Sequence, residues 1–356
     1  MDKSVIGLLM RANMGDANAQ HELGNCYYYG EGVEQSYETA AKWFAKAAEQ
    51  GHAGAQCDLG SCYHRGNRGV EQSYEKAIMW YTKAAEQGQA EAQFALAGCY
   101  SYGEGVEENE VQSAKWLTKA AQQGYSDAQY NLGIYYLHGS GVEQDPEYGI
   151  ALIRKAVAQG NVDAQAMLGA CYGNGYGVEE DYNQARSWLA KAAQQNHAVA
   201  QATLGMFYYF GRGCEIDYTQ ALKWFTKAAE QENADAQYML GQCYFNGEGV
   251  ARDIEQAIDW FTRATQQGHS GAEKMLGTLT EIVENRRKVR PVERTEVFIS
   301  FSSKDEKYVE EMKPFLKLLE RNHKIPIWYY QRLNAGDNWQ EEIRQHMSAA
   351  KVAVCI

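Results

Sequence analysis

The sequence predicts an α/α superhelical solenoid of about seven helix-pair repeats of 36 residues, followed by part of an α/β domain. Three observations lead to this prediction. The dipeptide Ala-Gln recurs every 36 residues, with one step of 37; each interval holds two helical stretches bounded by glycines; and short apolar runs alternate with helical segments after Pro291. The repeated dipeptides start at Ala19, Ala55, Ala92, Ala128, Ala164, Ala200 and Ala236, and Ala272-Glu273 starts an eighth unit.

The first helix of each unit runs from the Ala-Gln dipeptide to a tyrosine, as in AQHELGNCYYYG. Ala19, Leu23 and Tyr27 are spaced i, i+4 and i+8, so they share one helix face. A glycine such as Gly30 ends the helix, because glycine adopts the left-handed conformation at low cost. Residues 1–15 resemble a degenerate second helix of the repeat and are expected to cap the N-terminal end of the solenoid. The solenoid itself is expected to span residues 16–285.

The second helix of each unit begins after a residue whose side-chain oxygen can cap it. In the first unit Ala40, Trp43 and Ala47 form its predicted apolar stripe. Small residues such as Gly24 let helices approach closely, and the tryptophans are expected to fill the remaining space; Leu152 takes the tryptophan position of the fourth unit. No unit can bury its apolar face alone, so the repeats are expected to stack. The predicted caps are Ser36, Ser73, Asn109, Asp145, Asp181, Asp217 and Asp253.

Charge and hydropathy argue against several classes of protein. The net charge is −12, which makes nucleic acid or an anionic membrane an unexpected partner. No apolar run approaches the roughly 20 residues that span a bilayer. The first residues lack the apolar stretch of a secretory leader, so a cytoplasmic location is expected. The charge is uneven: residues 1–285 hold 20 basic and 36 acidic side chains, whereas residues 286–356 hold 14 and 10.

Five of the eight cysteines share one repeat position, which holds Tyr135 or Phe207 in other units. A position that accepts Cys, Tyr or Phe is expected to be an apolar packing site. No second cysteine recurs with it in each unit, so a disulfide framework is not expected. Neither C-x-x-C nor H-E-x-x-H spacing occurs, and no metal site is predicted. The five are Cys26, Cys62, Cys99, Cys171 and Cys243.

Three further features concern the surface. The Glu-Gln pairs that end the second helices are expected to form a solvated ridge. The basic linker 286–294 is either solvated or docks the second domain onto the acidic solenoid. Aromatic residues at the ends of the first helices either form a ladder for a ligand or pack within the solenoid. These aromatic residues include Tyr28, Tyr29, Tyr209 and Phe245.

The repeat pattern A-x-x-x-L-G-x-x-Y-x-x-G-x-G-V-x-x-D-x-x-x-A-x-x-W-x-x-K-A-A resembles the Sel-one-like repeat family, which is related to the tetratricopeptide repeats. The resemblance covers residues 15–285. It implies an α/α superhelix that binds a protein or peptide on its concave face, in many members as a signalling adaptor.

The last part of the chain reads as alternating strands and helices. Strands are predicted at 297–301, 325–330 and 352–356, with helices at 306–320 and 339–349, which indicates a parallel sheet. VFISFSSKD and QRLNAGDNW resemble the first box and the BB loop of a TIR (Toll/interleukin-1 receptor) domain. Residues 295–356 are therefore expected to form the N-terminal part of a flavodoxin-like TIR domain with strand order 2-1-3.

The TIR resemblance also implies an activity. Many bacterial TIR domains cleave NAD, and their catalytic glutamate lies on a helix after the third strand. That position lies beyond Ile356, so this chain is expected to lack the catalytic residue and to be inactive, with NAD as the possible substrate and no tightly bound cofactor. The reading frame is expected to continue past Ile356, because an apolar third strand would otherwise form an open sheet edge.

The resemblance further implies a nucleotide cleft at the carboxyl ends of the strands. One departure from the family is that Tyr329 and Tyr330 stand where an aspartate is frequent, which puts ribose or nicotinamide contacts in doubt. An alternative role for the BB loop is TIR–TIR assembly. The residues expected in the cleft are Ser302, Ser303, Lys304, Asp305, Trp328, Tyr330, Arg332, Asn334 and Gly336.

Together these features predict a sensor or interaction solenoid coupled to a TIR effector that, when complete, hydrolyses NAD in bacterial defence or stress signalling. The first alternative is a non-enzymatic adaptor or scaffold that acts through protein contacts of the repeats and TIR–TIR assembly. A second alternative is a scaffold with a degenerate TIR remnant. A glutamate past residue 356, on a helix after the third strand, would distinguish the enzyme from the adaptor.

Overall fold

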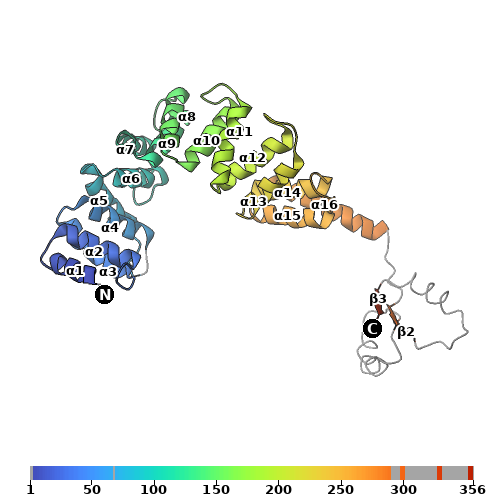
Figure 1. Ribbon diagram of the computed structural model, residues 1–356, viewed down its shortest axis with the longest axis horizontal. Coiled ribbons are helices and arrows are strands. Elements are labelled where there is room, and N and C mark those ends of the chain that lie inside the picture. The colour runs from blue at the N-terminus through green and yellow to red at the C-terminus, as the bar shows by residue number, and fades with distance from the viewer. Residues whose placement is uncertain (1–2, 67–68, 290–296, 301–326, 331–351, 356) are drawn as a thin grey trace, which may run out of the picture. The chain divides into compact units, whose positions relative to one another are not determined.

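The computed structural model describes residues 3–66, 69–289, 297–300, 327–330 and 352–355. The chain divides into two compact units, Met1–Met275 and Leu276–Ile356. The first unit is a helical solenoid of seven helix pairs, as the repeat predicts (Figure 1).

The two helices of each pair are antiparallel neighbours of nearly equal length. The first helices are α2 (Ala17–Tyr29), α4 (Ala53–Arg65), α6 (Ala90–Tyr102), α8 (Ser126–His138), α10 (Val162–Asn174), α12 (Ala198–Phe210) and α14 (Ala234–Asn246). The second helices are α3 (Tyr37–Glu49), α5 (Tyr74–Glu86), α7 (Glu110–Gln122), α9 (Pro146–Ala158), α11 (Tyr182–Gln194), α13 (Tyr218–Ala229) and α15 (Ile254–Gln266). Helix α1 (Lys3–Asn13) precedes the pairs, and α16 (Ser270–Val289) follows them and continues through residues 286–289 of the stretch expected as a linker.

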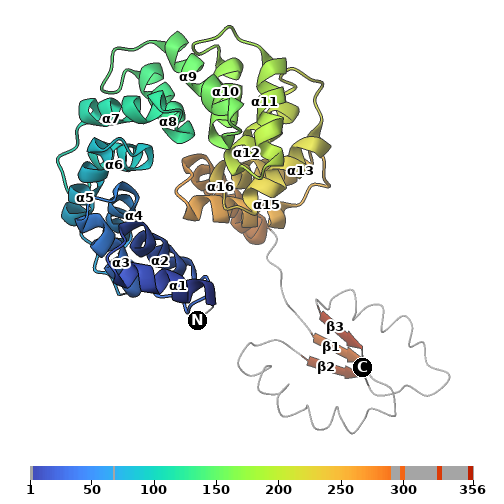
Figure 2. The same cartoon turned by 60° about the vertical axis from the view of Figure 1, so that its left-hand side comes forward.

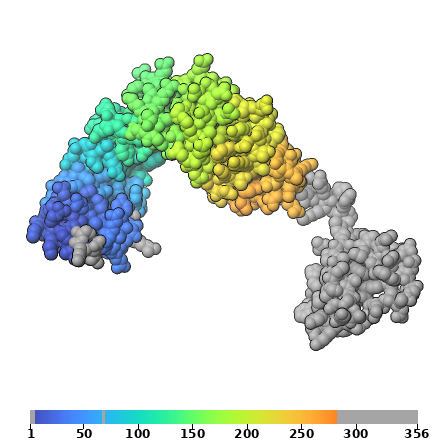
Figure 3. Space-filling view, viewed as in Figure 1, coloured from blue at the N-terminus to red at the C-terminus, as the bar shows by residue number. Residues whose placement is uncertain are grey.

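The pairs stack side by side along a curve. Figure 2 shows α6, α8 and α12 toward the inner side of this curve and α5, α7, α11 and α13 toward its outer side. The space-filling view shows that side chains close the space between successive pairs (Figure 3). The inner face is therefore built mainly from the first helices of the repeats.

The caps predicted from the sequence form as expected. Ser36 has extended backbone angles, and its hydroxyl accepts a hydrogen bond from the Thr39 amide. Asp217 does the same for the Gln220 amide of its helix. Gly30 ends α2 with φ = 78°, a left-handed conformation that costs glycine little. These local interactions fix where each helix starts and stops.

The residue after each tryptophan, and not the tryptophan itself, fills the space beside the small residues. Phe44, Phe225 and Phe261 are fully buried, whereas Trp43 is half-buried. A Cβ atom added to Gly24 would lie 2.5 Å from the Phe44 ring. The predicted stripe is wrong by one residue at this position, because the wide apolar face of a core helix admits two adjacent positions and packing selects between them.

The tryptophans instead lie partly at the surface, each beside a cation three residues later. The Lys46 ammonium lies 3.9 Å from the centroid of the Trp43 ring, and the Lys191 ammonium lies 3.7 Å from that of Trp188. Such contacts contribute about 0.5–1 kcal/mol at exposed sites.

The glutamines that end the second helices are not simply solvated. Gln231 donates a hydrogen bond of 2.7 Å from Nε2 to Oε1 of Gln201, which is buried and donates in turn to the Ala193 carbonyl at 3.1 Å. The same bond between glutamines recurs once in each of the seven repeats, where it joins the end of the second helix to the start of the first. The donor–acceptor pairs are Gln50–Gln20, Gln87–Gln56, Gln123–Gln93, Gln159–Gln129, Gln195–Gln165, Gln231–Gln201 and Gln267–Gln237. We refer to this set as the glutamine row; its donors are exposed, as expected of a solvated ridge, and are in addition hydrogen-bonded to the first helix of the same repeat.

The shared cysteine position packs in the core, as predicted. Cys62, Cys99, Cys171 and Cys243 are buried, and the seven cysteines of the solenoid are free thiols. Burial is the main cause that raises the pKa of Cys171 to about 11. These thiols are therefore protonated at neutral pH.

Of the aromatic residues at the ends of the first helices, Tyr28 and Tyr209 pack within the solenoid, whereas Tyr29 is exposed. Tyr28 makes edge-to-face contacts with Tyr29 and Tyr37, with ring centroids 5.0 and 5.1 Å apart. Tyr209 makes similar contacts, and its hydroxyl donates to the Glu248 carboxylate of the next unit. Packing within the solenoid therefore accounts for Tyr28 and Tyr209 without a ligand.

Beyond the end of α16, the described residues of the second unit form a parallel sheet of three strands. These are β1 (Val297–Ser300), β2 (Ile327–Tyr330) and β3 (Val352–Cys355), in the order β2-β1-β3. The strand order agrees with the expected 2-1-3. The helices predicted at 306–320 and 339–349 lie outside the described residues, so the α/β fold of this unit stays a prediction. Among the described helices, none combines the length and the apolar character needed to cross a membrane.

Candidate functional site

The expected nucleotide cleft falls mostly outside the described residues. Residues 302–305, Arg332, Asn334 and Gly336 lie there. Trp328 and Tyr330 lie on β2, paired in register with Phe298 and Ser300 of β1. The parallel register brings the ends of β1, β2 and β3 to one edge of the sheet, where a ligand of such folds would bind.

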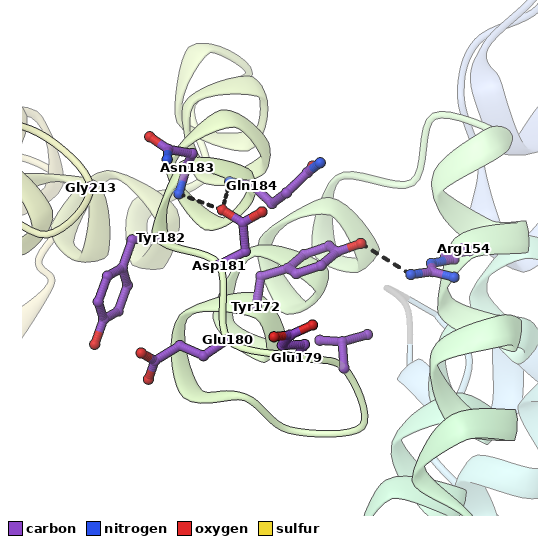
Figure 4. A pocket seen from close by; sticks show the side chains of 10 residues that line it. Arg154, Tyr172, Glu179, Glu180, Asp181, Tyr182, Asn183, Gln184 and Gly213 are labelled. Carbon is purple, nitrogen blue, oxygen red and sulfur yellow. Dashed lines mark hydrogen bonds between the residues drawn. The ribbon is translucent and has the colours of Figure 1, made fainter.

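The solenoid has a cleft between its fourth and fifth repeats, where α9, α10 and α11 meet. It has two lobes that share Arg154, Tyr172 and Gln184, and we call it the Arg154 cleft. The aromatic lobe has a volume of ≈ 520 Å³. The acidic lobe, shown in Figure 4, has a volume of ≈ 720 Å³. The other residues of the aromatic lobe are Val157, Ala158, Gln165, Leu168, Trp188 and Lys191, and those of the acidic lobe are Val178, Glu179, Glu180, Asp181, Tyr182, Asn183 and Gly213.

The cleft lies where the repeat departs most from its pattern. Arg154 stands at a position that holds alanine or threonine in the other six units, and Val157 stands where five of them have alanine. Leu152 stands in place of the tryptophan and is buried. The glutamine at the position of Gln165 donates from Nε2 to a main-chain carbonyl of the preceding helix in the six other repeats. Among these seven described glutamines Gln165 is the one without such a bond, and its side chain lines the cleft instead.

Two cationic side chains line the aromatic lobe without a direct ion pair to a described carboxylate. Arg154 Nη2 donates to the Tyr172 hydroxyl at 3.0 Å, which orients the guanidinium toward the cleft (Figure 4). Lys191, which also lines this lobe, lies over the Trp188 ring. Within the described part of the chain, no carboxylate forms an ion pair with Arg154 or Lys191. A bound carboxylate would find two cationic donors and an aromatic surface here.

The acidic lobe carries the opposite charge. Asp181 caps α11, since its Oδ1 accepts hydrogen bonds from the Asn183 amide at 2.9 Å and the Gln184 amide at 3.0 Å (Figure 4). Glu179 and Glu180 are exposed beside it. The cleft therefore offers a cationic and an anionic half to the same ligand, which suits a peptide with side chains of both signs better than a simple anion.

A second, smaller groove lies on the inner face, along α8, α10 and α12. It has a volume of ≈ 260 Å³ and includes Tyr130, Met167 and Val199. His197 lies at its edge, with Nε2 3.0 Å from the Asp163 carboxylate and Nδ1 accepting from the Ala200 amide. This groove is more apolar than the Arg154 cleft and lies on the face where the resemblance predicts binding.

Comparison with protein families identifies the repeat. The Sel1 repeat model matches seven consecutive stretches: 17–52, 53–89, 90–125, 126–161, 162–197, 198–233 and 234–269.

The chain belongs to the Sel1 repeat family.

The TIR domain model matches residues 297–356 of this Sel1 repeat protein. Sel1 repeats and TIR domains generally mediate protein–protein contacts, so the combination supports a role in protein interaction and signalling. No match is found among curated proteins.

Two solved structures of Sel1 repeat proteins are similar. One is a protective antigen of uropathogenic Escherichia coli strains with an SLR fold, at 37% identity and a TM-score of 0.68 over 77% of this chain. This chain spans 59% of the length of that antigen. The other is a Sel1 repeat protein from Oxalobacter formigenes, at 35% identity and a TM-score of 0.63, covering 78% of this chain and 80% of that one.

Sequence reasoning about the Sel1 repeats missed the Arg154 cleft. The signal was present, because Arg154 is the one charged residue at its position among the seven units. A repeat pattern is defined by the positions that recur, so it does not contain this residue. In a repeat protein, a residue that differs from its equivalents in the other repeats indicates a binding site more strongly than a residue that recurs in every repeat.

Proposed function

We propose that this Sel1 repeat protein is a signalling protein whose solenoid binds a protein or peptide segment in the Arg154 cleft. The observation that carries the proposal is the unpaired guanidinium of Arg154 in a cleft with one aromatic and one acidic lobe. The preferred ligand places a carboxylate beside an apolar or aromatic group in the aromatic lobe and a basic side chain against Glu179 or Glu180.

A peptide library displayed on phage and selected against the full chain tests this proposal. Selected peptides should share an acidic residue next to an apolar one. Arg154→Thr installs the residue of the second, third, sixth and seventh units. It should weaken binding of the selected peptides roughly 10- to 100-fold, since a charge-assisted hydrogen bond contributes about 1.5–3 kcal/mol.

Lys155→Thr is the matched control, because it removes the same charge from the next residue, which does not line the cleft. It should leave binding unchanged. Equal losses in both variants, or none in Arg154→Thr, would refute the proposed site.

For the complete protein we further propose that partner binding clusters the TIR domains, which then hydrolyse NAD in a bacterial defence or stress response. The TIR match at 297–356 supports this, and the catalytic glutamate is expected beyond Ile356. NAD is proposed as the substrate, with the cleft residues named above at the strand ends. The second candidate is a non-enzymatic adaptor that acts through TIR–TIR assembly.

Release of nicotinamide from NAD separates these candidates. Protein from the complete reading frame should cleave NAD, whereas the 356-residue chain should not. If neither protein cleaves NAD, even when artificially clustered, the result favours the non-enzymatic adaptor over the NAD hydrolase.

A further inference from the structure

Three side chains with metal-ligand chemistry meet between the second and third repeats. They are His64 on α4, Cys99 on α6 and Glu104 just after α6. One donor atom from each lies within 4.8 Å of the other two. His64 Nε2 and the Glu104 carboxylate are 2.8 Å apart. Cys99 is buried, whereas His64 and Glu104 have side chains that are 31% and 30% exposed, so an ion can reach the cluster from solvent.

The nitrogen, sulfur and oxygen donors of these three side chains suit some metal ions better than others. Imidazole nitrogen, thiolate and carboxylate oxygen are the ligands of Zn²⁺, and three protein ligands plus one water make an open tetrahedral site. Mg²⁺ and Ca²⁺ prefer oxygen ligands alone. Metal–ligand bonds of about 2.0–2.3 Å place donor atoms of a tetrahedral site roughly 3.3–3.8 Å apart. The widest pair of donor atoms therefore has to close by about 1 Å, and His64 Nε2 and the Glu104 carboxylate, 2.8 Å apart, have to separate by roughly 0.5 Å. Both shifts are small for the partly exposed Glu104 side chain.

The repeat supplies an internal comparison for this cluster. The cysteine and glutamate of the third unit recur at the same repeat positions in two other units, as Cys26 and Glu31 in the first and as Cys243 and Glu248 in the seventh. The seventh unit has a preceding repeat to compare with. In the sixth unit, which precedes Cys243 and Glu248 as the second precedes Cys99 and Glu104, the position of His64 holds Tyr209. The Tyr209 hydroxyl donates a hydrogen bond to Glu248. A hydrogen bond across the junction thus forms without histidine. The other residues of the His64 column are Tyr28, Ser101, Leu137, Gly173 and Phe245.

Packing holds the His64 ring in place. Its ring makes an edge-to-face contact with Tyr74, with centroids 5.3 Å apart, and a tilted contact with Tyr81 at 6.2 Å. A fixed imidazole loses little freedom when it binds an ion. The ring already directs Nε2 toward Glu104, so both partly exposed ligands face the same point.

We propose that His64, Cys99 and Glu104 bind one Zn²⁺ ion between the second and third Sel1 repeats, with water as the fourth ligand. On binding, the Cys99 thiol releases its proton to solvent and the sulfur bonds to the ion as thiolate. The three ligands come from two repeats, so the ion links them and stabilises their junction. The spacing of residues 64, 99 and 104 matches no short zinc motif, which is why a search for such motifs does not find the site.

Titration of the full chain with Co²⁺ tests the proposal, because thiolate bound to Co²⁺ gives a charge-transfer band in the near ultraviolet. The chain is first freed of metal with a chelator. We expect one equivalent of Co²⁺ to give the band and one equivalent of Zn²⁺ to abolish it. Lack of the band in the wild-type chain would overturn the proposal.

Two reciprocal variants make the test specific. His64→Tyr copies Tyr209 and can still donate to Glu104, so the fold should persist while the band is lost and affinity falls more than ~100-fold. Tyr209→His completes the set with Cys243 and Glu248 and should add a second equivalent of thiolate-bound Co²⁺. A band that persists in His64→Tyr means that another cysteine binds the ion and refutes the site. A correctly folded Tyr209→His chain with no second equivalent refutes the geometric argument.

Discussion

Replacement of Gly241 by alanine tests how the helix pairs are packed. A Cβ atom at this position would lie 2.5 Å from Cε1 and 2.6 Å from Cδ1 of Phe261, whose ring is fully buried. Carbon atoms in contact prefer about 3.5–4.0 Å, so the ring has to move by about 1 Å. Overpacking of this kind costs typically ~1–3 kcal/mol. Alanine returns up to ~1 kcal/mol of helix propensity, so we expect a net loss of about 1–2 kcal/mol.

The third repeat shows how the same conflict is avoided. There Ala97 occupies the position of Gly241, and Leu117 occupies that of Phe261; both are buried. Gly241→Ala combined with Phe261→Leu should therefore be more stable than the sum of the single variants. Residues in direct contact show coupling energies of about 0.5–3 kcal/mol, and we expect a value in that range here.

Denaturant unfolding followed by circular dichroism measures these differences. Because solenoid repeats contact only their neighbours, hydrogen exchange of α14 and α15 shows whether the loss is local. Gly98→Ala is the control, since Gly98 lies inside α6 with nothing within 4 Å of an added Cβ. It should stabilise the chain by up to ~1 kcal/mol. The reasoning fails if Gly241→Ala is as stable as Gly98→Ala, or if Phe261→Leu gives no rescue.

Two further predictions concern the polar contacts of the solenoid. Gln201→Leu should lower the free energy of unfolding by ~1–3 kcal/mol, because it removes both the bond from Gln201 to the Ala193 carbonyl and the bond that Gln201 accepts from Gln231. Gln165→Leu removes only the bond from Gln195 and should cost less; equal losses in denaturant unfolding would argue against the role given to the row. Burial, and secondly the neighbouring His21, lower the pKa of His52, whose Nδ1 caps α4 by accepting from a main-chain amide. Because the folded pKa lies below the unfolded value of about 6.5, His52 contributes stability that is present above pH 6.5 and lost as pH falls through the folded pKa. His52→Asn keeps the cap without titrating, so thermal unfolding between pH 7 and pH 5 should be less pH-dependent in this variant than in the wild type.

Much of the fold follows from local interactions and is therefore readable in the sequence. The period of the repeat, the caps such as Ser36 and Asp217, and the left-handed Gly30 depend on residues within one helix or turn. The strand order β2-β1-β3 was also expected, on the resemblance to TIR domains. By contrast, the sequence placed Trp43 in the core position that Phe44 occupies, because hydrophobic periodicity tolerates a shift of one residue on a wide apolar face.

Features that join residues about 30 to 40 positions apart needed the tertiary structure. The glutamine row connects Gln231 to Gln201, and the cluster of His64, Cys99 and Glu104 spans two repeats. The sequence alone determined that the chain is a solenoid of seven helix pairs, because each helix buries one face and no pair can do so alone. Which polar side chains meet across a junction, and that a cleft opens at Arg154, was decided by how successive pairs stack, since stacking sets which side chains from neighbouring repeats come within bonding distance.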